Sequence, residues 1–159
     1  MTSTVANTSA PRRFARGKFP APMYAAMSAL EDSSKAGLEP SLRELVKTRA
    51  SQMNGCAFCI DMHTKDAMAA GETPQRLFAL SAWREAPFFT EQERAALALA
   101  EALTEIHPHE RIDSAWDDAA EYFEDDQLAA LLMTVIAING WNRLAIASHT
   151  PVGSYQPRS

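Results

Sequence analysis

Residues 40–71 read PSLRELVKTRASQMNGCAFCIDMHTKDAMAAG, and they contain two helical patterns separated by Asn54-Gly55. Apolar residues recur at helical spacing on both sides of this pair, and Asn-Gly is a typical turn sequence. A tight turn here would fold the second helix back against the first. With ~1.5 Å of rise per residue on each helix, an antiparallel pair brings Glu44 about level with His63. The stretch therefore predicts a helical hairpin.

Helix-start signals mark most of the remaining chain. The expected starts are the Ser41/Glu44 capping box, Thr73 before Pro74, the Thr90/Glu93 capping box, Asp113 or Ser114, and Asp125 or Asp126. No alternating apolar run bounded by hairpin turns is present, and the chain has only six glycines. We predict an all-α fold, a single compact domain of about six to seven helices over residues 19–159.

Length and composition are those of one ordinary globular domain. The chain has 159 residues, 47% of them hydrophobic and 22% charged, which is enough for a real core. The longest apolar run, residues 128–138, is shorter than the ~20 residues of a membrane-spanning helix. No secretory signal pattern opens the sequence. We expect a cytoplasmic protein with no membrane partner, in a compartment where a disulfide is more often catalytic than structural.

The run from Leu128 to Ile138 is apolar on nearly every side of a helix, so it needs burial on every side. It is either the central core helix or a helix covered by a partner subunit. Trp141 follows closely, and tryptophan is enriched at protein interfaces. We expect a homo-oligomer formed through the helices.

The charge of the chain is uneven. Residues 1–18 contain four basic side chains and no acidic one, so this segment is +4 and the remainder is −9 within a net charge of −5. An acidic body argues against a nucleic-acid partner, which needs a basic face. The composition of residues 1–18 is also that of an organelle transit peptide. A flexible basic arm, or one that drapes over a subunit, is the preferred interpretation.

The only two cysteines of the chain, Cys56 and Cys59, stand three residues apart, and His63 follows four residues later. On a helix these three side chains share one stripe and can touch. The cysteines fall in the first turn, where free backbone N–H groups and the helix dipole stabilise a thiolate. A C-x-x-C at a helix start commonly has a lowered thiol pKa. The pattern favours redox chemistry, with the helix dipole acting most strongly on Cys56.

Two other interpretations of this stretch remain open. Cys56, Cys59 and His63 could bind zinc with Glu44 as the fourth ligand, although structural zinc sites usually draw two separated ligand pairs. Alternatively, all three side chains could simply pack in the helix core. Glu44 could likewise be a surface residue that belongs to the capping box with Ser41.

The other three histidines suggest no site from the sequence. His107 and His109 flank a proline at a helix exit, where a solvated surface position is expected. His149 lies near the end of the last helix, where a cation interacts favourably with the helix dipole.

Glu44, Cys56, Cys59 and His63 together resemble the E-x11-C-x2-C-x3-H signature of AhpD-like alkylhydroperoxidases in the carboxymuconolactone decarboxylase superfamily. The resemblance covers roughly residues 20–150 and includes NGCAFCIDMH and INGWNRLAIA. It implies an all-helical domain that assembles as a trimer or hexamer. One position departs from the best-known members: Phe58 stands where they carry a second histidine.

The resemblance also implies roles and a reaction. Cys59 would attack hydrogen peroxide or an organic hydroperoxide, Cys56 would condense with it to a disulfide, and His63 with Glu44 would relay protons. No cofactor or metal is implied, and an unidentified thiol or dithiol protein would return the electrons. The alternatives are a disulfide reductase or redox adaptor, a zinc-binding or structural module, and, more distantly, a lactone decarboxylase.

Overall fold

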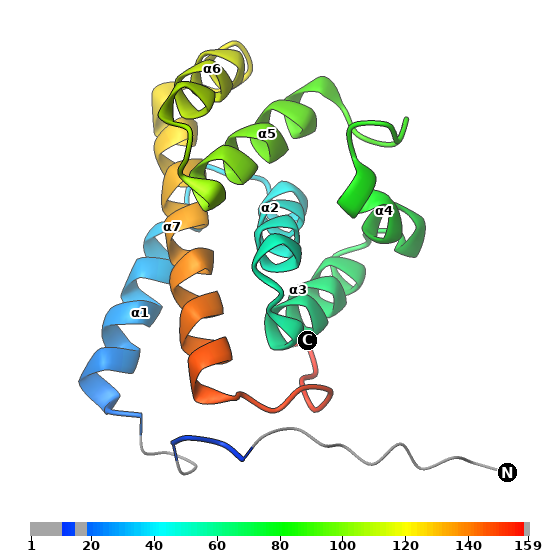
Figure 1. Cartoon of the computed structure of the whole chain (residues 1–159). Helices are drawn as coiled ribbons and strands as arrows, with labels where there is room; N and C mark the ends of the chain where they lie inside the picture. Colours follow the sequence, from blue (N-terminus) through cyan, green and yellow to red (C-terminus); the bar gives the residue numbers. More distant parts are fainter. Residues whose placement is uncertain (1–10, 15–18, 158–159) are drawn as a thin grey trace, which may run out of the picture.

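The computed structural model describes residues 11–14 and 19–157, and this part of the chain is helical with no strand. The all-α prediction is therefore confirmed, and Figure 1 shows the arrangement. The helices are α1 (Ala21–Ser33), α2 (Pro40–Asn54), α3 (Ala57–Ala69), α4 (Pro74–Ala79), the short 3₁₀ helix η1 (Leu80–Ala82), α5 (Glu91–Glu105), α6 (His109–Ala120) and α7 (Asp125–Ser148).

Several predicted helix starts are confirmed. The Thr73 hydroxyl accepts from the backbone N–H of Arg76 at the start of α4. Thr90 and Glu93 form a complete capping box at the start of α5. The long last helix begins at Asp125, as expected, but its capping box is formed by Glu124 and Gln127. These local patterns hold because each one satisfies orphan N–H groups of its own first turn.

Two predicted starts are wrong. The Ser41/Glu44 capping box does not form, because α2 begins at Pro40 and the Glu44 carboxylate turns toward α3 instead. Helix α6 begins at His109 rather than at Asp113 or Ser114. Pro108 already supplies the extended N-cap residue of α6, so the helix starts without a later cap.

Helix α7 is the core helix of the described chain. It packs against α1, α2, α3, α5 and α6, and Leu131 and Ile138 are completely buried. In Figure 1 it runs the length of the molecule between α1 and α2. Ile136 and Ile146 remain 46% exposed, so one stripe of the helix is uncovered. The core interpretation is confirmed, and association between copies stays a prediction.

By length and composition, α7 is also the one helix in the described ranges that would suit a membrane, with a mean hydropathy of 1.4. Its packing against five other helices accounts for this apolar composition. Gly140 lies in the middle of α7, where Met27 of α1 packs so closely that a Cβ would meet its Cε at 2.9 Å. The glycine thus lets α1 approach α7.

The chain on either side of this bundle is partly described. Residues 1–10 and 15–18 of the predicted basic arm lie outside the described residues, so the division at residue 18 stays a prediction. At residues 11–14, the backbone N–H of Arg13 donates to the carbonyl of Ser148 at 3.1 Å, which places this short segment against the end of α7. His107 and His109 are exposed and stacked, as expected of surface histidines.

A buried carboxylate joins α2, α5, α6 and the segment after η1. Glu101 of α5 is 2% exposed and accepts from Arg49 at 2.7 Å, Arg84 at 2.6 Å, Arg111 at 3.2 Å and the Trp83 indole N–H at 2.9 Å. Burial raises the pKa of Glu101, but the donors, led by Trp83 and Arg84, outweigh it and hold the pKa below its usual value. The contact therefore ties α5 and α6 to α2 through one buried carboxylate.

Replacing Glu101 with alanine is expected to lower the free energy of unfolding by about 3 kcal/mol, because three guanidinium groups lose a buried acceptor. Urea unfolding followed by circular dichroism measures this loss. The matched control is Glu105→Ala, which removes a carboxylate that is about half exposed and paired with Arg111 alone. The control should cost less than about 1 kcal/mol. Equal losses in the two variants would contradict the central role of Glu101.

Candidate active site

The turn between α2 and α3 positions the two cysteines. Gly55 ends α2 in the left-handed conformation, with φ 68° and ψ 30°. The backbone N–H of Cys56 then donates to the Ser51 carbonyl at 3.0 Å, and α3 starts at the next residue. The Asn54 amide donates to the side-chain oxygens of Asn139 at 2.9 Å and Asn142 at 2.8 Å. The turn is therefore held against α7, and the predicted hairpin is confirmed.

Cys56 is the N-cap residue of α3, and both cysteines are free and 1% exposed. The Cys59 thiol donates a hydrogen bond to the Cys56 sulfur, and this bond is the main cause that lowers the pKa of Cys56. Burial opposes it, while the backbone N–H groups of Cys59 and Phe58 add to it, and the pKa of Cys56 falls to about 7. The Cys59 thiol thus favours ionisation of Cys56 by donating to the sulfur that carries the charge.

The same contacts act oppositely on Cys59. Its proton is held by the Cys56 sulfur, and burial together with the neighbouring negative charge raises the pKa of Cys59 further. Asn142 of α7 donates to the Cys59 sulfur and partly offsets this rise. Asn142 is itself completely buried and also donates to the Ser51 hydroxyl at 3.0 Å. The order of ionisation is therefore Cys56 first.

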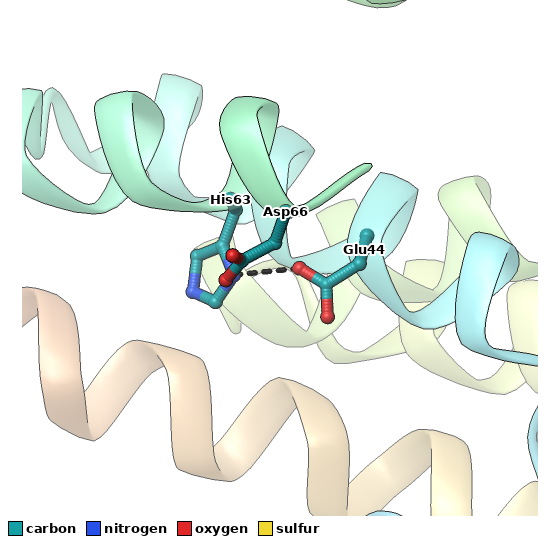
Figure 2. Close-up of side chains that lie close together, drawn as sticks. All are labelled: Glu44, His63 and Asp66. Atoms are coloured by element: carbon teal, nitrogen blue, oxygen red, sulfur yellow. Dashed lines mark hydrogen bonds and ion pairs between the residues drawn. The ribbon is translucent and has the colours of Figure 1, made fainter. Parts of the chain in front are cut away.

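His63 lies one turn beyond Cys59 on α3 and is 5% exposed. Its Nδ1 is 2.8 Å from Oε2 of Glu44, which reaches across from α2, and Figure 2 shows this pair. Burial raises the pKa of Glu44, but the hydrogen bond with His63 and the charges of His63, Lys47 and Arg43 outweigh it and lower the pKa. The surface interpretation of Glu44 is wrong, because a buried partner holds its carboxylate inside the hairpin.

A second carboxylate, which the sequence did not single out, stands beside this pair. Oxygen and nitrogen atoms of Glu44, His63 and Asp66 lie within 4.8 Å of one another, and Figure 2 shows the Asp66 carboxylate next to the His63 ring. The Tyr155 hydroxyl donates to both oxygens of Asp66, at 2.7 and 3.0 Å. Asp66 therefore anchors the C-terminal segment to α3.

The zinc site considered from the sequence is not assembled. Among the described residues, the possible metal-ligand atoms that lie within 4.8 Å of one another belong to Glu44, His63 and Asp66. Neither Cys56 nor Cys59 is part of this group. Zinc coordination needs all its ligands about 2 Å from one point. The cysteines instead hydrogen-bond to each other, so the geometry favours thiol chemistry over metal binding at the C-x-x-C.

A pocket of about 170 Å³ reaches the first of the two cysteines. Its lining comes from the α2–α3 turn and from the end of α7 with the segment that follows: Gly55, Cys56, Ala57, Phe58, Ala145, Ile146, His149, Thr150 and Val152. A larger pocket of about 260 Å³ lies between the Trp83 region, α5 and α6, and neither cysteine lines it. The smaller pocket is the candidate substrate site, because Cys56, whose pKa is lowered, lines it.

The structure brings all four sequence-predicted residues to one hairpin, as two hydrogen-bonded pairs, Cys56–Cys59 and Glu44–His63. It adds Asn142 behind the sulfurs and His149 at the pocket. A signal for Asn142 existed in the sequence, since two asparagines interrupt an otherwise apolar helix, and buried amides must find partners.

The family model described as the carboxymuconolactone decarboxylase family matches residues 21–102, which include the whole hairpin. The chain belongs to this family. The uncharacterised protein YdfG of Bacillus subtilis (strain 168) is 45% identical over 116 residues, which cover 72% of this chain and 78% of YdfG. The family membership expected from the cysteine motif is thereby confirmed.

Solved structures share the fold. A protein of unknown function from Agrobacterium tumefaciens, provisionally called an antioxidant defence protein AhpD, superposes with a TM-score of 0.85 at 36% identity. That match covers 91% of this chain and 100% of the other. The C82A variant of the debrominase Bmp8, in complex with 2,3,4-tribromopyrrole, gives a TM-score of 0.74 at 19% identity over 84% of this chain and 72% of its own. At such identity the similarity concerns the fold alone.

The hydrogen bond between Cys59 and Cys56 leads to a prediction about the reactivity of the Cys56 thiol. Alkylation of Cys56 by iodoacetamide should follow ionisation with a midpoint near pH 7. Cys59→Ala removes the donor that stabilises the thiolate, so the midpoint should rise toward the ordinary value of about 8.5. Peptide mapping of the alkylated protein over a pH series measures both.

The matched control is Cys56→Ala, in which Cys59 no longer faces a neighbouring thiolate. In this variant the pKa of Cys59 should be lower than in the intact protein, because the hydrogen bond to Cys56 and the charge of Cys56 no longer raise it. An unchanged Cys56 midpoint in Cys59→Ala would refute the role of this hydrogen bond.

Proposed function

We propose that this protein is a thiol-dependent peroxidase that reduces hydrogen peroxide or an organic hydroperoxide through a Cys56/Cys59 dithiol–disulfide cycle. The observation that carries the proposal is the position of Cys56 at the α3 N-terminus, where it is bonded to the Cys59 thiol and lines a pocket. This arrangement supplies a nucleophile and a resolving thiol in contact.

The first step forms an S–O bond and breaks the O–O bond. The Cys56 thiolate attacks the outer oxygen of the hydroperoxide and becomes a sulfenic acid, while the leaving oxygen takes a proton and departs as an alcohol or as water. The Cys59 thiol then attacks the sulfenic sulfur, which forms the disulfide and releases water. The two thiols together lose two electrons when the disulfide forms, and the hydroperoxide gains these two electrons.

The roles of the two cysteines differ here from those that the resemblance implies. The resemblance gives the attack on peroxide to Cys59, and that assignment stays a prediction. The lowered pKa of Cys56 and its position in the pocket favour Cys56 as the attacking sulfur. Cys59 does not line the pocket and holds its proton more tightly, which suits the resolving step.

In the second step, His63 is the proposed proton acceptor. Once Cys56 is a neutral sulfenic acid, the negative charge that raises the Cys59 pKa is gone. The Cys59 proton can then pass toward His63, one turn away on the same helix. Glu44 accepts from Nδ1–H of His63 in this tautomer, which leaves Nε2 as the basic nitrogen. Glu44 is thus a positioning residue for His63.

The reduced enzyme must be regenerated from outside, because one turnover consumes the two cysteines of the chain. The proposed reductant is a thiol or dithiol protein in the cytoplasm. We also propose that the protein is a homo-oligomer, a trimer or a hexamer. Exposed apolar side chains on two adjacent helices support association: Met23 and Tyr24 on α1, and Ile136 and Ile146 on α7.

The proposal is tested by adding one equivalent of cumene hydroperoxide to the reduced protein. Timed alkylation and intact mass should show rapid loss of both alkylatable thiols. Cys59→Ser should stop at a sulfenic acid on Cys56, which dimedone traps. Thiols of the unsubstituted protein that survive at the rate of free cysteine would sink the peroxidase proposal, and a sulfenic acid found on Cys59 of Cys56→Ser at the full rate would reverse the two roles.

Glu44→Gln should slow disulfide formation after peroxide addition by about 100-fold, because His63 loses the partner that fixes its tautomer and supports its charge. The first step should change little, and rapid-quench trapping of the sulfenic acid separates the two. Glu39→Gln is the matched control, since Glu39 is exposed and directly precedes the same helix. A variant with the normal rate of disulfide formation would remove Glu44 from the mechanism.

Disulfide exchange with a partner protein is the second candidate function. A low-pKa cysteine in a pocket with a resolving thiol behind it is also the arrangement that a disulfide reductase uses. In that case Cys59→Ser should accumulate a mixed disulfide between Cys56 and an oxidised protein or a small disulfide. Exchange that is fast while peroxide reacts slowly would favour this candidate.

A further inference from the structure

The Cys59 sulfur lies in an apolar cluster and has one polar partner on another helix. Both cysteines pack with Ala50 of α2 and Ile138 of α7, and Cys59 is 1% exposed. The hydrogen bond to Cys56, followed by burial, raises the pKa of Cys59, whereas the hydrogen bond from Asn142 lowers it. Asn142 is therefore a group on α7 that favours a negative charge on this sulfur.

Neighbouring polar groups fix which end of the Asn142 amide faces the cysteines. Its Oδ1 accepts from the Asn54 amide at 2.8 Å. Its Nδ2 donates to the Ser51 hydroxyl at 3.0 Å and to the Cys59 sulfur. An amide nitrogen has two hydrogens, and these two acceptors use both of them. Because Asn142 is completely buried, solvent does not compete for these bonds.

The orientation of Asn54 is fixed in turn by a third amide. Nδ2 of Asn139 donates to the backbone carbonyl of Val135 at 3.0 Å, and a carbonyl can only accept. Oδ1 of Asn139 is thus free to accept from Asn54 at 2.9 Å, and the same Asn54 nitrogen donates to Asn142. The backbone of α7 therefore sets the direction of a row of three amides that ends with an N–H at Cys59.

The proposed cycle needs a thiolate on Cys59 whichever cysteine meets the peroxide. Cys59 attacks the peroxide in the order that the resemblance implies, and it attacks the sulfenic sulfur of Cys56 in the other order. In both cases the S–H bond loses its proton before the sulfur forms an S–O or S–S bond. A hydrogen bond to an ionised acceptor is stronger than one to a neutral acceptor, so a fixed donor favours the thiolate.

We propose that Asn142 is a catalytic residue whose side-chain N–H, oriented by Asn54, stabilises the Cys59 thiolate during the dithiol–disulfide cycle. Asn142 keeps its own hydrogens, and the Cys59 proton goes to a base, the role proposed above for His63. When the new bond to sulfur forms, the negative charge leaves Cys59 and the hydrogen bond weakens. The inference rests on the proposed thiol function and adds the group that stabilises one of its two thiolates.

A protein with a single thiol tests this contact without peroxide. In Cys56→Ala the remaining thiol is Cys59, and the ultraviolet absorbance of its thiolate is followed over a pH series. The variant Cys56→Ala/Cys59→Ala is the blank that removes the contribution of the tyrosines. Adding Asn142→Leu should raise the midpoint of Cys59 by about one pH unit or more, because a charge-assisted hydrogen bond is lost. Leucine is chosen because it has a similar branched shape and no donor.

Thr134→Val is the matched control for this titration. Thr134 is also completely buried in α7, about two turns before Asn142, and its hydroxyl donates to the Ala130 carbonyl at 2.8 Å. The control removes a buried polar group from the same helix and should move the Cys59 midpoint by less than about 0.3 unit. If Asn142→Leu does not fold, Asn142→Ala removes the same donor without adding apolar volume.

The protein with both cysteines provides a second measurement. After addition of cumene hydroperoxide, Asn142→Leu should form the disulfide about 10-fold more slowly than the unsubstituted protein at neutral pH. The difference should shrink as the pH rises, because a higher pH restores the thiolate that the hydrogen bond favoured. Damage to the packing of α7 would instead slow the reaction equally at every pH.

The outcomes separate this inference from the function on which it rests. An unchanged Cys59 midpoint in Asn142→Leu, an equal rise in Thr134→Val, or a rate loss that is the same at every pH overturns the role of Asn142. If the unsubstituted protein reacts with peroxide no faster than free cysteine, the peroxidase proposal fails. A raised midpoint still supports Asn142 in that case, because disulfide exchange uses the same Cys59 thiolate.

Discussion

The left-handed backbone of Gly55 is the constraint on which the site depends, because it reverses the chain between α2 and α3 within one residue. A Cβ at this position would meet no atom within 4 Å, so glycine serves the positive φ and not the lack of space. The reversal places Cys56 in an extended conformation at the N-cap of α3, where backbone N–H groups of Phe58 and Cys59 point at its sulfur. It also brings Glu44 of one helix opposite His63 of the other. A longer or differently turned connection would separate both pairs.

Helix α2 holds the bundle together through polar contacts as well as apolar ones. Glu44 reaches α3, Arg49 reaches the buried Glu101 of α5, and Asn54 reaches α7. A carboxylate in a protein interior is costly unless donors surround it. Glu101 meets this requirement with four donors, whereas Glu44 relies mainly on a single histidine, helped by the more distant charges of Lys47 and Arg43. The difference suits their proposed roles, because a carboxylate bound by several cations is fixed, while one bound by an imidazole can respond to a proton.

The ionisable side chains near the two sulfurs form two separate groups. The pocket side contains Cys56 and His149, and the hairpin interior contains His63 and Glu44. Asn142 of α7 donates to Cys59 and to Ser51 behind the cysteine pair, which keeps the second thiol in place. The C-terminal segment supplies Thr150 and Val152 to the pocket, and its Tyr155 binds Asp66 near the interior pair. One segment is thus in contact with both sides of the site.

The sequence by itself determined the helical class, most helix starts and the cysteine pair at a helix N-terminus, because these features depend on neighbours within a few residues. Thr90 and Glu93 illustrate this, since their capping box closes within one turn. Predictions from neighbouring residues were wrong where a residue distant in the sequence binds the same side chain. Glu44 does not form the expected capping box, because it makes a buried, charge-assisted hydrogen bond with His63 instead. Only the tertiary structure decided that Asn142 lies behind Cys59 and that His149 shares a pocket with Cys56. These contacts join residues more than eighty positions apart, and their geometry is set by how α7 packs on the hairpin, which no local pattern encodes.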